Sequence, residues 1–135
     1  MREVRVIVAG SRTYSDADRI FSCLDKAFEE IKSKMQEPCE FTIVSGGCRG
    51  VDMVGEQYAK THGLGLARFP AQWDKYGRGA GPIRNEEMLE FASEKDKVPY
   101  LIAFWDYKSS GPRGIIALAR NKRIPVRIEK IVSGM

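Results

Sequence analysis

The stretch that decides the fold runs FTIVSGGCRGVD, from Phe41 to Asp52. A short run of β-forming residues leads into a glycine-rich turn, and a helical pattern begins directly behind that turn. Strands that alternate with helices in this way lie parallel in one sheet, because each helix carries the chain back across the sheet. The same order of strand, turn and helix recurs on both sides of this stretch.

Outward from residues 41–52, hydrophobic periodicity places the other elements. Strands are expected over residues 5–9, 41–44, 66–69, 100–105 and 126–128. Helices are expected from Ser15 or Asp16 to Met35, from Asp52 to Gly63, over 84–93 and over 115–121, and residues 72–82 are expected to form a loop. The predicted fold class is α/β, with a doubly wound, mostly parallel sheet of about five strands and helices on both faces.

The composition is that of an ordinary globular chain, with 43% hydrophobic and 30% charged residues among 135. Residues 1–135 are therefore expected to form a single domain. The apolar run near Met1 is too short for a signal peptide, so we expect a cytoplasmic protein without a membrane segment. Three cysteines at irregular spacing and the single histidine, His62, lead us to expect no metal site and no catalytic triad.

Positive charge gathers at the C-terminal end of the chain, whose net charge is +4. Residues 108–135 contain seven Lys or Arg and a single acid, Glu129. Such an end can bind nucleic acid or an acidic lipid, but basic residues also complement the C-terminus of a helix. The charge pattern leaves both interpretations open.

Glycine and arginine occur together in four loops that follow predicted strands. The glycines are Gly10; Gly46, Gly47 and Gly50; Gly77, Gly79 and Gly81; and Gly111 and Gly114. The arginines are Arg12, Arg49, Arg78 with Arg84, and Arg113. Glycine lets backbone N–H groups approach an anion closely, the helix behind each loop adds positive potential, and arginine is a permanently charged, forked donor. For a single loop, tight turns and rim arginines explain the pattern, but four loops at one sheet edge favour a phosphate-bearing ligand.

Four motifs resemble the YspA-like, cpYpsA-related branch of the SLOG superfamily. They are GSR at residues 10–12, SGGCRGVD at 45–52, FPAQWDKYG at 69–77 and AGPIRNEEML at 80–89. The first two also resemble elements of the DNA-processing protein A (Smf). The resemblance spans nearly the whole chain and implies a Rossmann-like fold with a pocket for a nucleotide or a nucleotide derivative. It also implies a homodimer, because relatives associate through their helices.

The superfamily includes the Lonely Guy phosphoribohydrolases, which cleave nucleoside monophosphates with an arginine and a glutamate. Arg84 matches the arginine, but Leu118 stands where the glutamate belongs. A leucine can neither position water nor stabilise positive charge. Asp52, Asp74 or Glu86 can replace the glutamate only if the pocket brings one of them to the sugar.

Several single residues carry two interpretations each. Asp52 fits a ribose ligand or an acid that complements its helix dipole. Trp73 fits a base-stacking residue or a buried anchor of its loop. Asn85 fits a residue that contacts the ligand or one that caps its helix. Cys48 fits a small residue that fills space better than a reactive thiol. Asp106 is a secondary candidate for ligand binding at the carboxyl edge of the sheet.

The leading hypothesis is a module that binds or senses a nucleotide-type phosphorylated small molecule and needs neither a metal nor a cofactor. The alternatives are N-glycosidic cleavage of a nucleoside monophosphate, with Arg84 and Asp52 as catalytic residues, and single-stranded nucleic-acid binding. The predicted ligand-binding residues are Gly10, Ser11, Arg12, Gly46, Gly47, Arg49, Asp52, Trp73, Arg84, Asn85, Gly111, Arg113 and Gly114.

Overall fold

The structure is a computed structural model that describes residues 1–132. Its strands are β1 (Arg2–Gly10), β2 (Cys39–Ser45), β3 (Gly65–Arg68), β4 (Lys97–Trp105) and β5 (Val126–Lys130). Its helices are α1 (Ala17–Lys34), α2 (Val51–Thr61), α3 (Trp73–Tyr76), α4 (Ala80–Ala92) and α5 (Ser110–Asn121), with a 3-10 turn, η1, over Gly77–Gly79. Strands and helices alternate along the chain, as the sequence predicts.

The five strands form one sheet in the order β3-β2-β1-β4-β5, and each neighbouring pair is parallel. This confirms the predicted doubly wound α/β fold. The chain moves outward from β1 to β3 and then crosses to β4 on the other side of β1. The loops after β1 and β4 therefore leave the sheet in different directions, which opens a crevice at this switch point.

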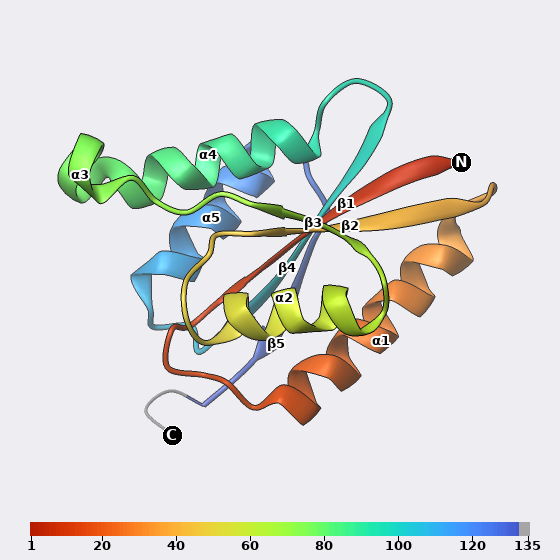
Figure 1. Ribbon diagram of the computed structural model, residues 1–135, viewed down its shortest axis with the longest axis horizontal. Coiled ribbons are helices and arrows are strands. Elements are labelled where there is room, and N and C mark those ends of the chain that lie inside the picture. The colour runs from red at the N-terminus through yellow and green to blue at the C-terminus, as the bar shows by residue number, and fades with distance from the viewer. Residues whose placement is uncertain (133–135) are drawn as a thin grey trace.

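A helical layer covers each face of the sheet (Figure 1). Helices α1 and α2 pack on one face, where Val4, Val6 and Val8 of β1 point. Helices α4 and α5 pack on the other face, where Ile7 of β1 and Leu101 of β4 point. Because both faces are covered, the central strands are apolar on both sides.

The predicted apolar stripe of α1 is confirmed, because its buried residues are Ile20, Leu24, Ala27, Phe28 and Ile31. Asp16 is the N-cap of this helix, and its carboxylate accepts a hydrogen bond from the Arg19 amide at 3.1 Å. The cap fixes where the chain turns from the loop after β1 into α1.

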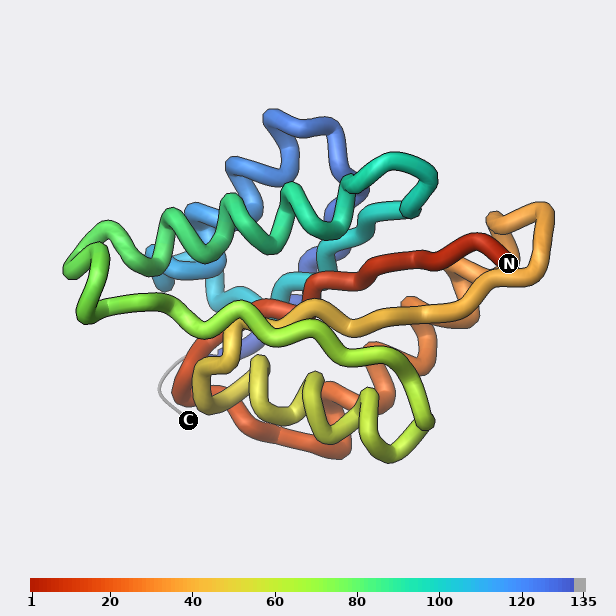
Figure 2. Tube along the Cα trace, turned by 45° about the horizontal axis from the view of Figure 1, so that its top comes forward, coloured from red at the N-terminus to blue at the C-terminus, as the bar shows by residue number. Residues whose placement is uncertain are grey.

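The prediction of a loop over residues 72–82 is wrong. The segment forms α3, η1 and the first turn of α4, and Figure 2 shows it as a green extension beyond the post-strand end of the sheet. The glycines suggested a loop, but Gly77 ends α3 with a positive φ of 57° while Gly79 and Gly81 adopt helical geometry. Pro82 lies in the first turn of α4, where its missing N–H costs no hydrogen bond. Helix α4 therefore begins at Ala80, four residues before the predicted start at Arg84.

No helix within residues 1–132 combines the length and the apolar character that crossing a membrane requires.

Candidate functional site

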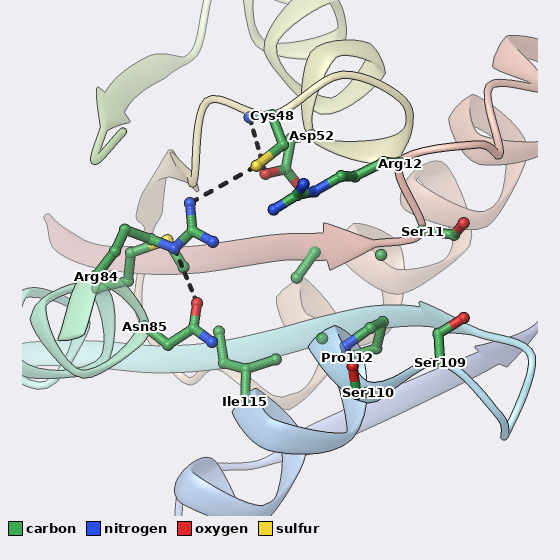
Figure 3. A pocket seen from close by; sticks show the side chains of 14 residues that line it. Ser11, Arg12, Cys48, Asp52, Arg84, Asn85, Ser109, Ser110, Pro112 and Ile115 are labelled. Carbon is green, nitrogen blue, oxygen red and sulfur yellow. Dashed lines mark hydrogen bonds between the residues drawn. The ribbon is translucent and has the colours of Figure 1, made fainter. Parts of the chain in front are cut away.

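A cavity of about 550 Å³ opens at the carboxyl edge of the sheet, at the switch point between β1 and β4. Its lining comes from the loops after β1, β2 and β4 and from the side of α4 (Figure 3). The lining residues are Ala9, Gly10, Ser11, Arg12, Cys48, Asp52, Arg84, Asn85, Met88, Ser109, Ser110, Gly111, Pro112 and Ile115. Elements far apart in the sequence thus share one concave site.

Gly50 allows close contact between the loop after β1 and the loop that leads into α2. The Val51 amide donates to the Ser11 carbonyl at 3.2 Å, so the start of α2 touches the loop after β1. Gly50 has a φ of 77° and a ψ of −130°, which side chains with a Cβ rarely adopt. A Cβ here would overlap the carbonyl oxygen of Ser11 and lie 2.6 Å from that of Arg12. The glycine therefore permits the contact that places Ser11 and Arg12 beside the cavity.

Arg84 is the most deeply placed cation of the site, with 9% of its surface exposed. Its Nη1 donates to the Gly46 carbonyl at 2.7 Å and contacts the Cys48 sulfur at 3.8 Å, and its Nε donates to the Asn85 amide oxygen at 2.9 Å. The guanidinium fits because residue 46 is glycine, since a Cβ there would lie 2.6 Å from Nη1. Within residues 1–132, Nη2 donates to no protein acceptor, and Figure 3 shows it turned toward Arg12.

Arg12 reaches into the same space from the loop after β1, so two guanidinium groups face each other (Figure 3). Neither Arg12 nor Arg84 forms a salt bridge within the part of the chain that the structure describes. Two cations that face a shared cavity without a paired carboxylate create a positive potential suited to an anion.

Asp52, in the first turn of α2, is the buried acid of the cavity. Its Oδ2 accepts a hydrogen bond from the Cys48 amide at 3.2 Å. Burial raises the pKa of Asp52 from its usual 3.8 to about 6, against the opposing effects of this hydrogen bond and of Arg84. An acid that titrates near neutral pH in a cavity is a common feature of functional sites.

Because the pKa of Asp52 is raised in the folded state, the fold favours its protonated form. This contribution to stability is fully present below pH 3.8 and is lost as pH rises through about 6. We expect Asp52→Asn to increase the free energy of unfolding by up to about 3 kcal/mol at pH 8 and to leave it unchanged near pH 3. Urea unfolding of both proteins across this range measures the difference. A difference that does not vary with pH would contradict the assignment.

Asp106 organises the turn that leads into α5. Its Oδ1 accepts hydrogen bonds from the amides of Lys108 and Ser109 at 2.8 and 2.7 Å, and its Oδ2 accepts one from the Ser109 hydroxyl at 2.9 Å. The sequence marked Asp106 as a secondary ligand candidate. In the structure its carboxylate fixes the position of the residues that precede α5.

Of the predicted site residues, the cavity brings together Gly10, Ser11, Arg12, Asp52, Arg84, Asn85 and Gly111. Gly46 and Gly47 lie behind Arg84 in the β2–α2 loop, outside the lining, and the Gly47 amide donates to the Ser45 hydroxyl at 3.0 Å. Asn85 does not cap α4, whose N-cap is Gly79, but holds the Arg84 Nε.

The remaining predicted residues lie outside the lining as well. Arg49 and Gly114 are exposed. Arg113 is exposed and lies over the ring of Trp105, 5.9 Å from its centroid. Trp73 is 49% exposed on α3, so it is not a buried anchor, and the Arg12 guanidinium lies 5.9 Å from its ring centroid. Trp73 therefore lies beside Arg12, which lines the cavity, but does not line the cavity itself.

On the α5 side of the cavity, sequence reasoning predicted Gly111 but missed the neighbouring residues that line it. Ser109, Ser110, Pro112 and Ile115 line it, and Met88 of α4 completes its apolar part. The pattern SSGP, at residues 109–112, is typical of the start of a helix and could have drawn attention to the two serines.

Two comparisons place the chain among known proteins. The sequence is 27% identical over 127 residues to the Gene 61 protein of Mycobacterium phage D29, which covers 90% of this chain and 93% of that protein. No solved structure matches. The sequence profile of the YspA, cpYpsA-related SLOG family matches residues 4–76, which include most of β1, all of β2, the loop that carries Arg12 and the helix α2 that carries Asp52. The chain belongs to the YspA, cpYpsA-related SLOG family.

Proposed function

We propose that this protein binds a nucleotide or a nucleotide-derived phosphorylated molecule in the cavity between β1 and β4. Membership of the SLOG family suggests nucleotide-related binding or processing. The observation that carries the proposal is the buried Arg84, whose Nη2 faces a cavity shared with Arg12. A guanidinium is a strong partner for a phosphate oxygen, and it is costly to bury without an anion.

The size of the cavity supports a small molecule. Sites for small molecules usually enclose about 300–1,000 Å³ and combine apolar walls with a few polar groups. This cavity, at about 550 Å³, has apolar walls from Met88 and Ile115 and polar groups from Arg84, Asn85 and Asp52. A ligand with a phosphate and an apolar or aromatic part matches both kinds of wall.

Native mass spectrometry of the freshly purified protein tests the proposal. We expect a mass excess that disappears on denaturation and that fragments to a phosphorylated molecule. A thermal-shift screen with nucleoside mono-, di- and triphosphates provides the second measurement. A bare protein mass together with no shift from any nucleotide would reject the proposal.

A second candidate function, N-glycosidic cleavage of a nucleoside monophosphate, is favoured by Asp52 alone. Its raised pKa suits a proton donor to a departing base, whereas Asp74 and Glu86 are exposed and lie outside the lining. Water would add to the sugar carbon as the glycosidic bond breaks, giving a free base and a sugar phosphate. Chromatography of nucleoside monophosphates incubated with the protein should then detect free base, and Asp52→Asn should stop its release.

The remaining expectations stay predictions. Single-stranded nucleic-acid binding would give an affinity that falls steeply as salt increases, because phosphate contacts release counterions. A homodimer would be measured by analytical ultracentrifugation, and a cytoplasmic location by fractionation of the source cell.

A further inference from the structure

The glycine-rich loop between β2 and α2 has backbone N–H groups that the protein itself engages. The Gly47 amide donates to the Ser45 hydroxyl at 3.0 Å, and the Cys48 amide donates to Asp52 Oδ2 at 3.2 Å (Figure 3). An amide that already has a protein acceptor can bind a phosphate oxygen only by giving up that hydrogen bond. The sequence predicts that Gly46 and Gly47 bind the ligand directly, whereas these contacts indicate an indirect role for the loop.

One peptide group of this loop connects Arg84 to the residues behind it. The Gly46 carbonyl and the Gly47 amide belong to the same planar unit, so the orientation of one fixes that of the other. The carbonyl accepts a hydrogen bond from Arg84 Nη1 at 2.7 Å, and the amide donates to the Ser45 hydroxyl at 3.0 Å. Two glycines flank the peptide, and Gly47 has a φ of 73°, so local sterics restrict its rotation little. The hydrogen bond to Ser45 therefore helps to keep the carbonyl directed at Arg84.

Glu56 of α2 orients the Ser45 hydroxyl from the side away from the peptide. Ser45 is fully buried, and Glu56 is 5% exposed. The hydroxyl donates to Glu56 Oε2 at 2.7 Å, and the same oxygen accepts a hydrogen bond from Arg68 Nε at 3.0 Å. A hydroxyl has one hydrogen, so once this is given to Glu56 only its lone pairs are left for the Gly47 amide. The carboxylate thus makes Ser45 an acceptor toward the loop.

We propose that Glu56 is a positioning residue of the nucleotide site, which acts through Ser45 and the peptide between Gly46 and Gly47 to direct Arg84. This inference rests on the proposed function, because it specifies how the same site is held in place. Glu56 lies outside the cavity lining, so its effect on a ligand passes through the groups that it orients. That effect should disappear when Arg84 is absent.

Glu56→Met tests the inference, because methionine has a similar length but offers the hydroxyl no strong acceptor. We expect this variant to bind AMP and ADP about tenfold more weakly than the parent, since Arg84 is no longer directed before the ligand arrives. Glu56→Gln keeps an oxygen that can accept from Ser45, and it should lose less than about threefold. Titration calorimetry measures the affinities.

Ser45→Ala breaks the same connection at its other end and leaves the pair of Glu56 and Arg68 in place. It should therefore lose about tenfold as well, and the double variant with Glu56→Met should lose no more than either single variant. The matched control is Gln57→Met, which places the same side chain on the exposed side of α2 and should bind as the parent does. Urea unfolding identifies any variant that has lost its fold.

A mutant cycle with Arg84→Ala separates positioning from a general effect on the fold. In the Arg84→Ala background, adding Glu56→Met should weaken binding by less than about twofold, as read by NMR titration at millimolar nucleotide. A tenfold loss that persists in this background, or a parent-like affinity of folded Glu56→Met and Ser45→Ala, would overturn the inference while nucleotide binding stands. Failure of the parent protein to bind either nucleotide would instead remove the proposed function with it.

Discussion

Arg84→Ala is expected to eliminate retention of the ligand through purification and to weaken nucleotide binding at least about 100-fold. Each hydrogen bond between a charged group and its partner contributes about 1.5–3 kcal/mol, and a forked guanidinium makes more than one. Arg84 is held at three points, by Gly46, Cys48 and Asn85, so its remaining nitrogen is already directed when the ligand arrives. Native mass spectrometry and titration calorimetry measure the loss.

Two further variants separate the role of Arg84 in binding from its role in folding. Arg84→Lys keeps the positive charge but loses the forked geometry, and we expect an intermediate loss of about tenfold. Arg78→Ala removes an exposed arginine from η1, outside the cavity, and should bind as the parent does. Urea unfolding identifies any variant that has lost its fold. A folded Arg84→Ala that retains the ligand like Arg78→Ala would remove Arg84 from the site.

The order of strands and helices follows from local signals in the sequence. Apolar β-forming runs such as Phe41–Val44 are buried on both faces of a parallel sheet and need no partner to be recognised. Over residues 72–82 the glycine content outweighs a weak helical pattern, so the sequence predicts a loop there. The short helices of this segment depend on packing, since the Trp73 ring lies 3.7 Å from the position of a Cβ on Gly81.

Which residues line the cavity depends on distances between side chains, and a sequence does not contain these distances. The sequence predicts that all four post-strand loops contribute to the site, and the location at the carboxyl edge follows from the parallel sheet. Which arginine enters the cavity depends on the direction of its side chain. Arg84 points inward from the side of α4, whereas Arg113 lies over Trp105 at the start of α5. In the sequence, Arg84 and Arg113 both stand at or just before the start of a predicted helix. Their spacing therefore does not show which of the two enters the cavity.

Arg5 is a buried charged residue that hydrophobic periodicity does not predict. It lies between Val4 and Val6 in the central strand, and the sequence predicts only a buried strand there. Its Nη1 donates to the Phe91 carbonyl and to Glu94, both at 2.6 Å, and its guanidinium lies 3.8 Å from the Phe91 ring centroid. The partners come from the end of α4 and from the turn directly after it, nearly ninety residues later. A buried arginine is tolerated only because the fold supplies them.

Gly50→Ala is expected to lower the free energy of unfolding by about 3 kcal/mol or more. Two costs combine at this position. The backbone conformation of Gly50 is one that alanine rarely adopts, and the added Cβ would overlap backbone atoms of Ser11 and Arg12. Backbone atoms cannot rotate away as a flexible side chain can, so the loop after β1 must move away from the start of α2. Denaturation in urea measures the loss.

Gly63→Ala is the matched control, because it separates the two costs. Gly63 follows the end of α2 with a φ of 65°, and a Cβ there would meet no atom within 4 Å. Gly63→Ala should lower the free energy of unfolding by only about 1–2 kcal/mol, which is the cost of an alanine in the left-handed backbone conformation. Since the displaced loop carries Arg12, Gly50→Ala should also weaken nucleotide binding, whereas Gly63→Ala should not. Equal destabilisation by the two substitutions, with binding intact in both, would show that the contact at Gly50 does not hold the wall of the cavity.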